Sequence, residues 1–212
     1  MSTQTTIVAQ CTPTGSGALA LIRVSGHDAL TIVARCAHFS SKQSLLTAAS
    51  HTIHHGWVVG SSSKKKIDEV LFLVMHAPKT FTGEHTVEIT CHNNQFLIQD
   101  IIQEIILCGA RLAQPGEFTR CAVENNKIDL LQAESINEVI HAHNQQALKA
   151  AFLQVEGSLS QWIAKIEKKI MHCIVLIEAS FEFLEEDVDF SENIKRELHD
   201  VLQIINSLKV TF

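Results

Sequence analysis

Apolar positions follow two different patterns along the chain, alternating or clustered in the first part and helical in the second. In the first part, short apolar runs bounded by turn residues predict strands. Those strands are Thr6–Gln10, Ala18–Val24, Ile53–Val59, Ile67–Met75, His85–Cys91 and Arg111–Gln114. Helical spacing predicts two helices, Gly26–Cys36 and Gln95–Cys108, with Gly109 as a left-handed stop. The order β-β-α-β-β-β-α-β predicts an α+β fold, an open mixed sheet with helices on one side.

In the second part, apolar residues recur at helical spacing from about Asp129 onward. They form one stripe near Leu130–Ile140 and another from Ala147 to Ile177. The acidic stretch 185–189 interrupts this pattern, and Ser191 can cap a last helix. We therefore expect two or three long amphipathic helices, whose apolar stripes need a second copy or a further segment as a partner.

Turn residues and charge change near the same place. All three prolines, and eight of the nine glycines, lie at or before Gly116. Residues 121–212 carry 8 Lys+Arg and 15 Asp+Glu, whereas the rest of the chain is nearly neutral. We therefore expect two domains, an α+β domain at 1–118 and the first part of a helical domain at 119–212.

Composition limits the class of protein. With 46% hydrophobic and 19% charged residues in 212, the chain is too apolar for a disordered one. It has no apolar run of membrane-spanning length and no signal-peptide pattern, so we expect a cytoplasmic protein without a membrane partner. The six cysteines are scattered without a CxxC pair, which favours reduced thiols.

Common cofactor signatures are absent from the sequence. A P-loop string does not occur, and Thr14–Gly17 has glycines typical of a tight turn but no dinucleotide fingerprint. His54 and His55 alternate to opposite faces of a strand, and Cys91 and His92 diverge in the same way, so we expect no metal site and no Cys/His nucleophile pair. The lysines at 64–66 are most simply a solvated hairpin tip.

Three charged residues stand in positions that suit a ligand. Glu88 lies within an apolar strand, where a carboxylate can line a cleft and grip adjacent N–H donors, or simply face solvent. Arg23 closes the apolar strand 18–22 and can anchor an anion or end the strand in solvent. Lys127 lies in a polar turn between the two predicted domains, and domain junctions often hold ligands.

Several strings of residues together resemble the tRNA-modification GTPase family called MnmE or TrmE, in the same order and over nearly the whole chain. The strings are Thr6–Gln10, Thr12–Pro13, Gly15–Gly17, Ile22–Gly26, Phe81–Glu84, Glu88, Cys91–His92, Pro115–Arg120, Asn126–Leu130, Gln132–Glu134 and Phe183–Phe190.

This resemblance implies a specific fold and function. The N-terminal domain would bind a tetrahydrofolate derivative, 5-formyl or 5,10-methylene, with a fold like the folate-binding part of the aminomethyltransferase, and would form a homodimer. The helices would begin a helical domain into which the family inserts a GTPase domain. Family members act with an MnmG-like flavoprotein to modify the tRNA wobble uridine at carbon 5, and the folate supplies the one-carbon unit.

The resemblance also assigns the candidate site. Arg23, Glu88 and Lys127 match the family's folate-contacting positions, and no catalytic residue can be named. Asn93–Asn94 and Asn125–Asn126 replace glycine-containing turns, and asparagine is the non-glycine residue best tolerated at positive φ. Since the chain has no P-loop and lacks the family's C-terminal cysteine segment, we do not expect it to hydrolyse GTP or modify tRNA alone.

The sequence is also compatible with two other functions. A stand-alone folate-dependent aminomethyl transferase would need an acid or base at the reactive centre, and the sequence offers none beyond Glu88. A non-catalytic dimerisation scaffold would use its helices for association and keep only a vestigial pocket.

Overall fold

The structure is a computed structural model, and it describes residues 5–40, 44–61, 63–182 and 190–211. The chain forms two compact units, residues 1–128 and 129–212. The division falls at residue 128 rather than at the expected residue 118. The reason is a short helix, α3 (Glu117–Glu124), which the sequence pattern did not reveal and which lies in the first unit.

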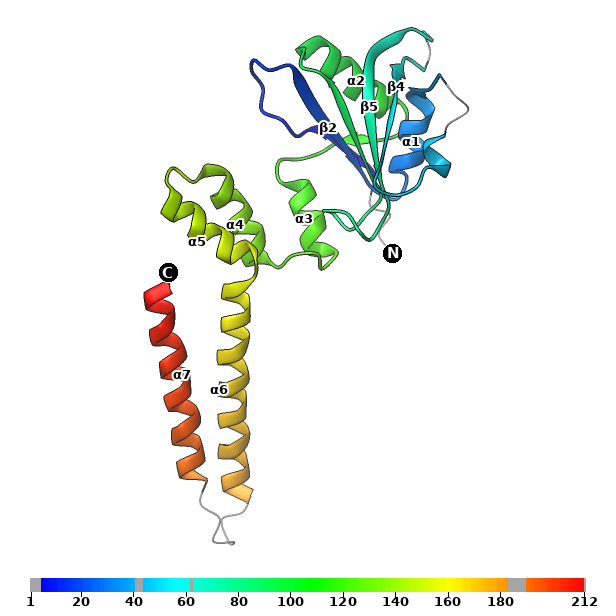
Figure 1. Ribbon diagram of the computed structural model, residues 1–212. Helices are drawn as coiled ribbons and strands as arrows, with labels where there is room; N and C mark the ends of the chain where they lie inside the picture. The colour runs from blue at the N-terminus through cyan, green and yellow to red at the C-terminus, as the bar shows by residue number, and fades with distance from the viewer. Residues whose placement is uncertain (1–4, 41–43, 62, 183–189, 212) are drawn as a thin grey trace. The chain divides into compact units, whose positions relative to one another are not determined.

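A seven-stranded mixed sheet forms the centre of the first unit (Figure 1). Its strand order is β3-β4-β5-β6-β2-β1-β7; the β1–β7 pair is parallel and every other neighbouring pair is antiparallel. The predicted α+β class with a mixed sheet is confirmed. The strands are β1 (Ile7–Gln10), β2 (Leu19–Ser25), β3 (Ala37–His38), β4 (Thr52–Val59), β5 (Lys66–Met75), β6 (Thr86–His92) and β7 (Arg111–Leu112).

One face of the sheet carries the core, together with α1 (Ala29–Cys36) and α2 (Gln95–Leu107). In β6, apolar residues occupy every second position, and they lie on the core face because successive side chains of a strand point to opposite faces. Val87, Ile89 and Cys91, at alternate positions of this strand, are buried to 0–1% exposure. We call the opposite face, which carries Arg23 and Glu88 and is not covered by α1 or α2, the open face.

Local signals explain where the helices begin and end. The Asn94 side chain accepts hydrogen bonds from the N–H groups of Phe96 and Leu97 and so caps α2. Gly109 follows this helix with a φ of 120°. Asn126 adopts a φ of 54°, as expected for a turn normally built with glycine, whereas Asn94 is extended with a φ of −121°. The positive-φ expectation is therefore confirmed for Asn126 and wrong for Asn94.

Two further short elements were not predicted from the pattern of apolar residues. Strand β3 has only two residues, and a 3-10 helix, η1 (Leu45–Thr47), follows it. Both are shorter than the window over which apolar periodicity can be recognised. Leu45 is nevertheless 1% exposed and completes the core next to α1.

The second unit contains four helices in the part of the chain that the structure describes. They are α4 (Leu130–His141), α5 (Gln145–Val155), α6 (Ser158–Glu182) and α7 (Ser191–Thr211). Gly157, with a φ of 83°, separates α5 from α6, so the single long stripe expected there is two helices. The predicted acidic break at 185–189 lies outside the described residues, and α7 begins at Ser191.

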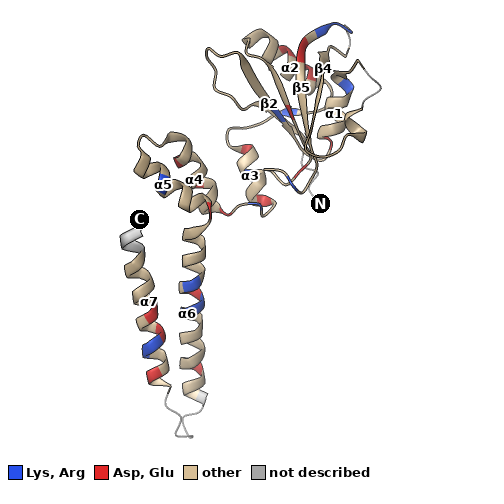
Figure 2. Cartoon of the chain, in the orientation of Figure 1, with Lys and Arg blue, Asp and Glu red and all other residues tan. Residues whose placement is uncertain are grey.

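Paired charges join α6 to α7, as the charged residues in Figure 2 indicate. Lys169 lies 2.8 Å from Glu197 and 2.7 Å from Asp200. These two helices also expose apolar side chains, for example Phe181 at 68% and Leu202 at 58%. Apolar surface of this extent is typical of a face that contacts another segment or chain.

Among the described residues, no helix combines the length and the apolar character that a membrane span requires.

Candidate functional site

Two of the predicted site residues, Arg23 and Glu88, contact each other. They are directly paired across β2 and β6, on the open face of the sheet. Arg23 Nε donates to Glu88 Oε1 over 2.8 Å, and Nη2 lies 2.7 Å from the same oxygen. Their side chains keep 21% and 15% of their exposure. The pair is thus partly desolvated, which strengthens it relative to a fully exposed ion pair.

The contacts leave part of each group available. Nε and Nη2 of Arg23 both contact Oε1, and Oε2 of Glu88 forms no hydrogen bond with another described residue. A carboxylate oxygen without a protein partner can accept a hydrogen bond from a ligand N–H. This face of the sheet therefore presents an acceptor whose position is fixed by an arginine.

Two aromatic rings flank the guanidinium. The Cζ atom of Arg23 lies 5.4 Å from the ring centroid of Phe81 and 5.4 Å from that of Phe118. Each ring face attracts the cation, and together they restrict where the guanidinium can move. The sequence strings Phe81–Glu84 and Pro115–Arg120 contained these phenylalanines, but nothing in the strings indicated that they approach Arg23.

Lys127, the third predicted residue, touches neither Arg23 nor Glu88. Its Nζ donates to the carbonyl of Pro78 over 2.9 Å, and its Cγ lies 3.2 Å from the position that a Cβ on Gly83 would occupy. Lys127 therefore contacts the loop 78–84, the same loop whose Phe81 approaches Arg23.

This loop is held at several points. Ser25 Oγ lies 2.7 Å from the hydroxyl of Thr82, which is fully buried. Asn125 Nδ2 donates to the Thr82 carbonyl over 2.7 Å. Gly83 has a φ of 79°, and a Cβ there would lie 2.9 Å from Asn125. Close approach and positive φ both explain glycine at this position.

An exposed thiol, Cys11, lies beside the ion pair. Desolvation by surrounding atoms raises the pKa of Cys11, the Arg23 guanidinium opposes this, and the Glu88 carboxylate adds to it. No motif in the sequence connects Cys11 with Arg23 and Glu88. A thiol with a raised pKa is mostly protonated near neutral pH, so it is a weak nucleophile.

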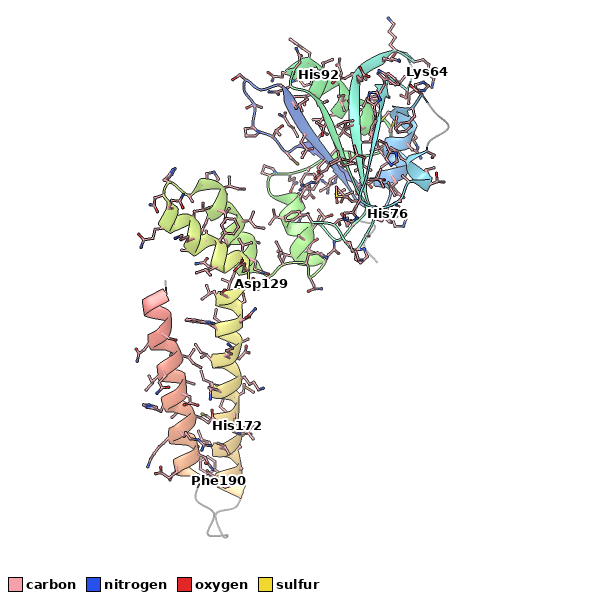
Figure 3. All side chains as sticks on the ribbon, viewed as in Figure 1. Lys64, His76, His92, Asp129, His172 and Phe190 are labelled. Carbon is pink, nitrogen blue, oxygen red and sulfur yellow. The ribbon has the colours of Figure 1, made fainter. Side chains whose placement is uncertain are left out.

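Two histidines, His76 and His85, lie on either side of the loop 78–84 in the sequence and contact each other. The rings of His76 and His85 are 5.4 Å apart and perpendicular, and His85 Nδ1 accepts from the N–H of Ala77 over 3.3 Å. Burial lowers the pKa of His85, and the neighbouring His76 and His27 lower it further. Figure 3 shows His76 at the end of the sheet opposite to His92 and Lys64.

Cys91 and His92 do not pair with each other, and neither do His54 and His55. Burial raises the pKa of Cys91 to about 11, while His92 turns away to pair with Asp68 at 2.8 Å. His54 contacts Thr52 at 2.8 Å, on the opposite face of β4 from His55. Among the described residues, no group of three or more His, Cys, Asp or Glu side chains could hold a metal ion.

Family models match both units of the chain. The model described as "GTP-binding protein TrmE N-terminus" matches residues 6–127, and the model described as "MnmE helical domain" matches residues 130–212. The chain belongs to the MnmE family. The recognition from sequence strings is thereby confirmed, and the boundary between the two matches coincides with the boundary between the two structural units.

Curated MnmE relatives support the same assignment. The chain is 44% identical to the tRNA modification GTPase MnmE of Christiangramia forsetii over 90% of this chain and 40% of the relative. It is 38% identical to that of Geobacillus kaustophilus, over 94% and 43%, and 36% identical to that of Bacillus pumilus, over 97% and 47%. The chain therefore spans less than half the length of these MnmE relatives.

Proposed function

We propose that this MnmE chain binds a tetrahydrofolate derivative on the open face of its sheet, at Arg23, Glu88 and Lys127. The observation that carries the proposal is the Arg23–Glu88 pair, which leaves Oε2 of Glu88 available beside two aromatic rings. A pterin ring presents adjacent amino and ring N–H donors, which suit such an oxygen. Arg23 holds Oε1 throughout, so the ligand ring donates to Oε2.

Lys127 supplies a positive charge for the acidic part of the ligand. Folates carry carboxylates on their glutamyl tail and carbonyl oxygens near the reactive centre. Lys127 extends over the Gly83 turn to the Pro78 carbonyl, from which a carboxylate would readily draw its ammonium group. We propose that Lys127 leaves Pro78 and pairs with the tail when the ligand binds. The bound form would be the 5-formyl or the 5,10-methylene derivative.

We further propose that the first unit forms a homodimer. The open face exposes large apolar side chains: Leu19 at 60%, Ile53 at 64% and Leu71 at 40%. Burying such side chains against a second copy would stabilise the dimer by about 25 cal/mol for each Å² removed from water. A dimer would also exclude water from the neighbouring ion pair.

In this proposal the folate provides the one-carbon unit for modification of the tRNA wobble uridine at carbon 5. The reaction would take place in the cytoplasm together with an MnmG-like flavoprotein. The GTPase activity in the relatives' name is a property of proteins more than twice as long as this chain. The role proposed for these 212 residues is therefore folate binding and dimer formation.

Calorimetric titration with 5-formyltetrahydrofolate tests the site. We expect binding by the unmodified chain, a loss of at least tenfold in affinity for Glu88→Gln, and a smaller loss for Lys127→Met. Glu69→Gln is the matched control, because Glu69 is an exposed carboxylate on β5 that pairs with His55. Equal affinity of Glu88→Gln and the unmodified chain would refute the site.

Light scattering tests dimer formation separately. Ile53→Lys is expected to give a monomer without unfolding the sheet, since Ile53 is 64% exposed. A dimer that binds no folate would instead support the non-catalytic scaffold.

A further inference from the structure

A cavity lies on the other face of the sheet from the Arg23–Glu88 pair. Its volume is about 260 Å³, and it lies between β1, the β1–β2 loop and the first turns of α2. Gln10 of β1 contributes to it, whereas the preceding residue Ala9 pairs with Arg23 on the open face. Because side chains alternate along a strand, the two sites are separated by the sheet itself.

Uncharged amide side chains dominate the polar lining of this cavity: Gln10, Asn93, Gln95 and Gln99. Ile98, 4% exposed, and Ile102 supply apolar surface. None of the lining residues is ionisable. An ion would therefore find no opposite charge here, whereas an uncharged ring with donors and acceptors on its edge would find partners for both.

Two of the amides are held in place by the protein. Asn93 Nδ2 donates to the Gly15 carbonyl over 2.8 Å, which leaves its Oδ1 as an oriented acceptor. Gln10 Nε2 lies 3.4 Å from the Thr12 hydroxyl, which directs its Oε1 in the same way. The side chains of Gln95 and Gln99 form no hydrogen bond with other described residues, so their amide groups can turn to meet a ligand.

The start of α2 does not supply a competing anion site. Asn94 Oδ1 already accepts from the N–H groups of Phe96 and Leu97, at 2.9 and 3.4 Å. Those are donors that a phosphate at a helix N-terminus would need. The cap therefore favours a neutral ligand over an anion.

We propose that this cavity binds a flat, uncharged heterocycle with a ring N–H beside a carbonyl. A uracil-type nucleobase has this edge, and so does the pterin of a folate. The N–H would donate to Asn93 Oδ1, the carbonyl would accept from Gln95 or Gln99, and the ring would lie on Ile98 and Ile102. A volume near 260 Å³ suits a single base or a bare pterin better than a complete folate.

Side-chain amide resonances of Asn93, Gln95 and Gln99, recorded by ¹⁵N NMR, test the proposal. Uridine and pterin are titrated separately to millimolar concentration, with 3-methyluridine and inorganic phosphate as comparison ligands. We expect saturable shifts with uridine, with pterin or with both, at least a fivefold weaker response to 3-methyluridine, and no response to phosphate. The ligand that gives the shifts identifies the source of the ring.

Two variants on α2, one inside the cavity and one outside it, test whether the NMR response comes from the cavity. Gln99→Leu is expected to weaken the response at least fivefold, whereas Gln103→Leu, an exposed glutamine outside the cavity, leaves it unchanged. Glu88→Gln leaves the response intact as well, which separates this site from the proposed folate site. No shift with either ring compound, an equal response to 3-methyluridine, or shifts with phosphate would overturn the proposal.

Discussion

Arg23 and Glu88, 65 residues apart in sequence, form an ion pair across adjacent strands, with Nε and Nη2 of the arginine on one carboxylate oxygen. The pair is partly desolvated, and the guanidinium of Arg23 lies 5.4 Å from the ring centroids of both Phe81 and Phe118. This arrangement would preorganise the proposed site, because the arginine fixes the orientation of the carboxylate. Its energetic and chemical consequences can be measured.

The energetic coupling between Arg23 and Glu88 should exceed that of an exposed pair. A double-mutant cycle with Arg23→Gln and Glu88→Gln, followed by urea denaturation, is expected to give about 1 kcal/mol. The same cycle with His55→Asn and Glu69→Gln serves as control; those side chains are 57% and 54% exposed, so less than about 0.5 kcal/mol is expected. Equal coupling in the two cycles would contradict the desolvation argument.

Cys11 should report occupancy of the proposed folate site. Its raised pKa keeps iodoacetamide labelling slow at pH 7, and labelling should accelerate as the pH rises toward and above 9. With 5-formyltetrahydrofolate at about ten times its Kd, the rate should fall about tenfold, since only the unliganded fraction reacts. Mass spectrometry measures the rate, and the Glu88→Gln variant should lose the protection. Unchanged labelling at saturating folate would place the ligand elsewhere.

Acidification should loosen the loop between His76 and His85. The pKa of His85 is lowered in the folded protein, so the unfolded chain takes up a proton first as the pH falls below about 6.5. Stability is therefore full above that pH and declines below it, as the Ala77 N–H loses its acceptor. Amide exchange at Ala77 between pH 5 and 8 should show this decline, and His85→Asn should abolish it. His54→Asn, on β4, should retain the pH dependence.

Glu117 should stabilise the first unit in a pH-dependent way. Hydrogen bonds from Arg111, and one from the Gln114 N–H, lower the pKa of this buried carboxyl to about 2. The stabilisation is complete above the unfolded value of 4.5 and is lost as the pH falls toward 2.

Glu117→Gln is accordingly expected to lower the free energy of unfolding by about 2–3 kcal/mol at pH 7, and by much less near pH 2. Urea denaturation at both pH values measures the difference. Glu69→Gln, at an exposed position, should have little effect at either pH. A Glu117→Gln deficit that does not depend on pH would mean that packing, not charge, accounts for its effect.

Patterns within single elements could be predicted because they depend on neighbouring residues. The alternation along β6 places Val87, Ile89 and Cys91 on one face and Glu88 on the other, and the structure buries the first three in the core. Asn126 took the left-handed conformation expected for its turn. The helix α3 has eight residues, as α1 has, but its buried residues are Glu117, Cys121 and Ala122, so no stripe of large apolar residues indicated it.

The sequence by itself determined the family, the α+β class, most strands and helices, and the three charged residues of the candidate site. Only the tertiary structure decided that Arg23 contacts Glu88, that Phe81 and Phe118 flank the arginine, and that Lys127 reaches the loop at Pro78 instead. It also decided that β7 lies parallel to β1 at the edge of the sheet. The physical reason is that periodicity and turn preferences act over a few neighbouring residues, whereas strand order, register and desolvation depend on which distant segments pack together.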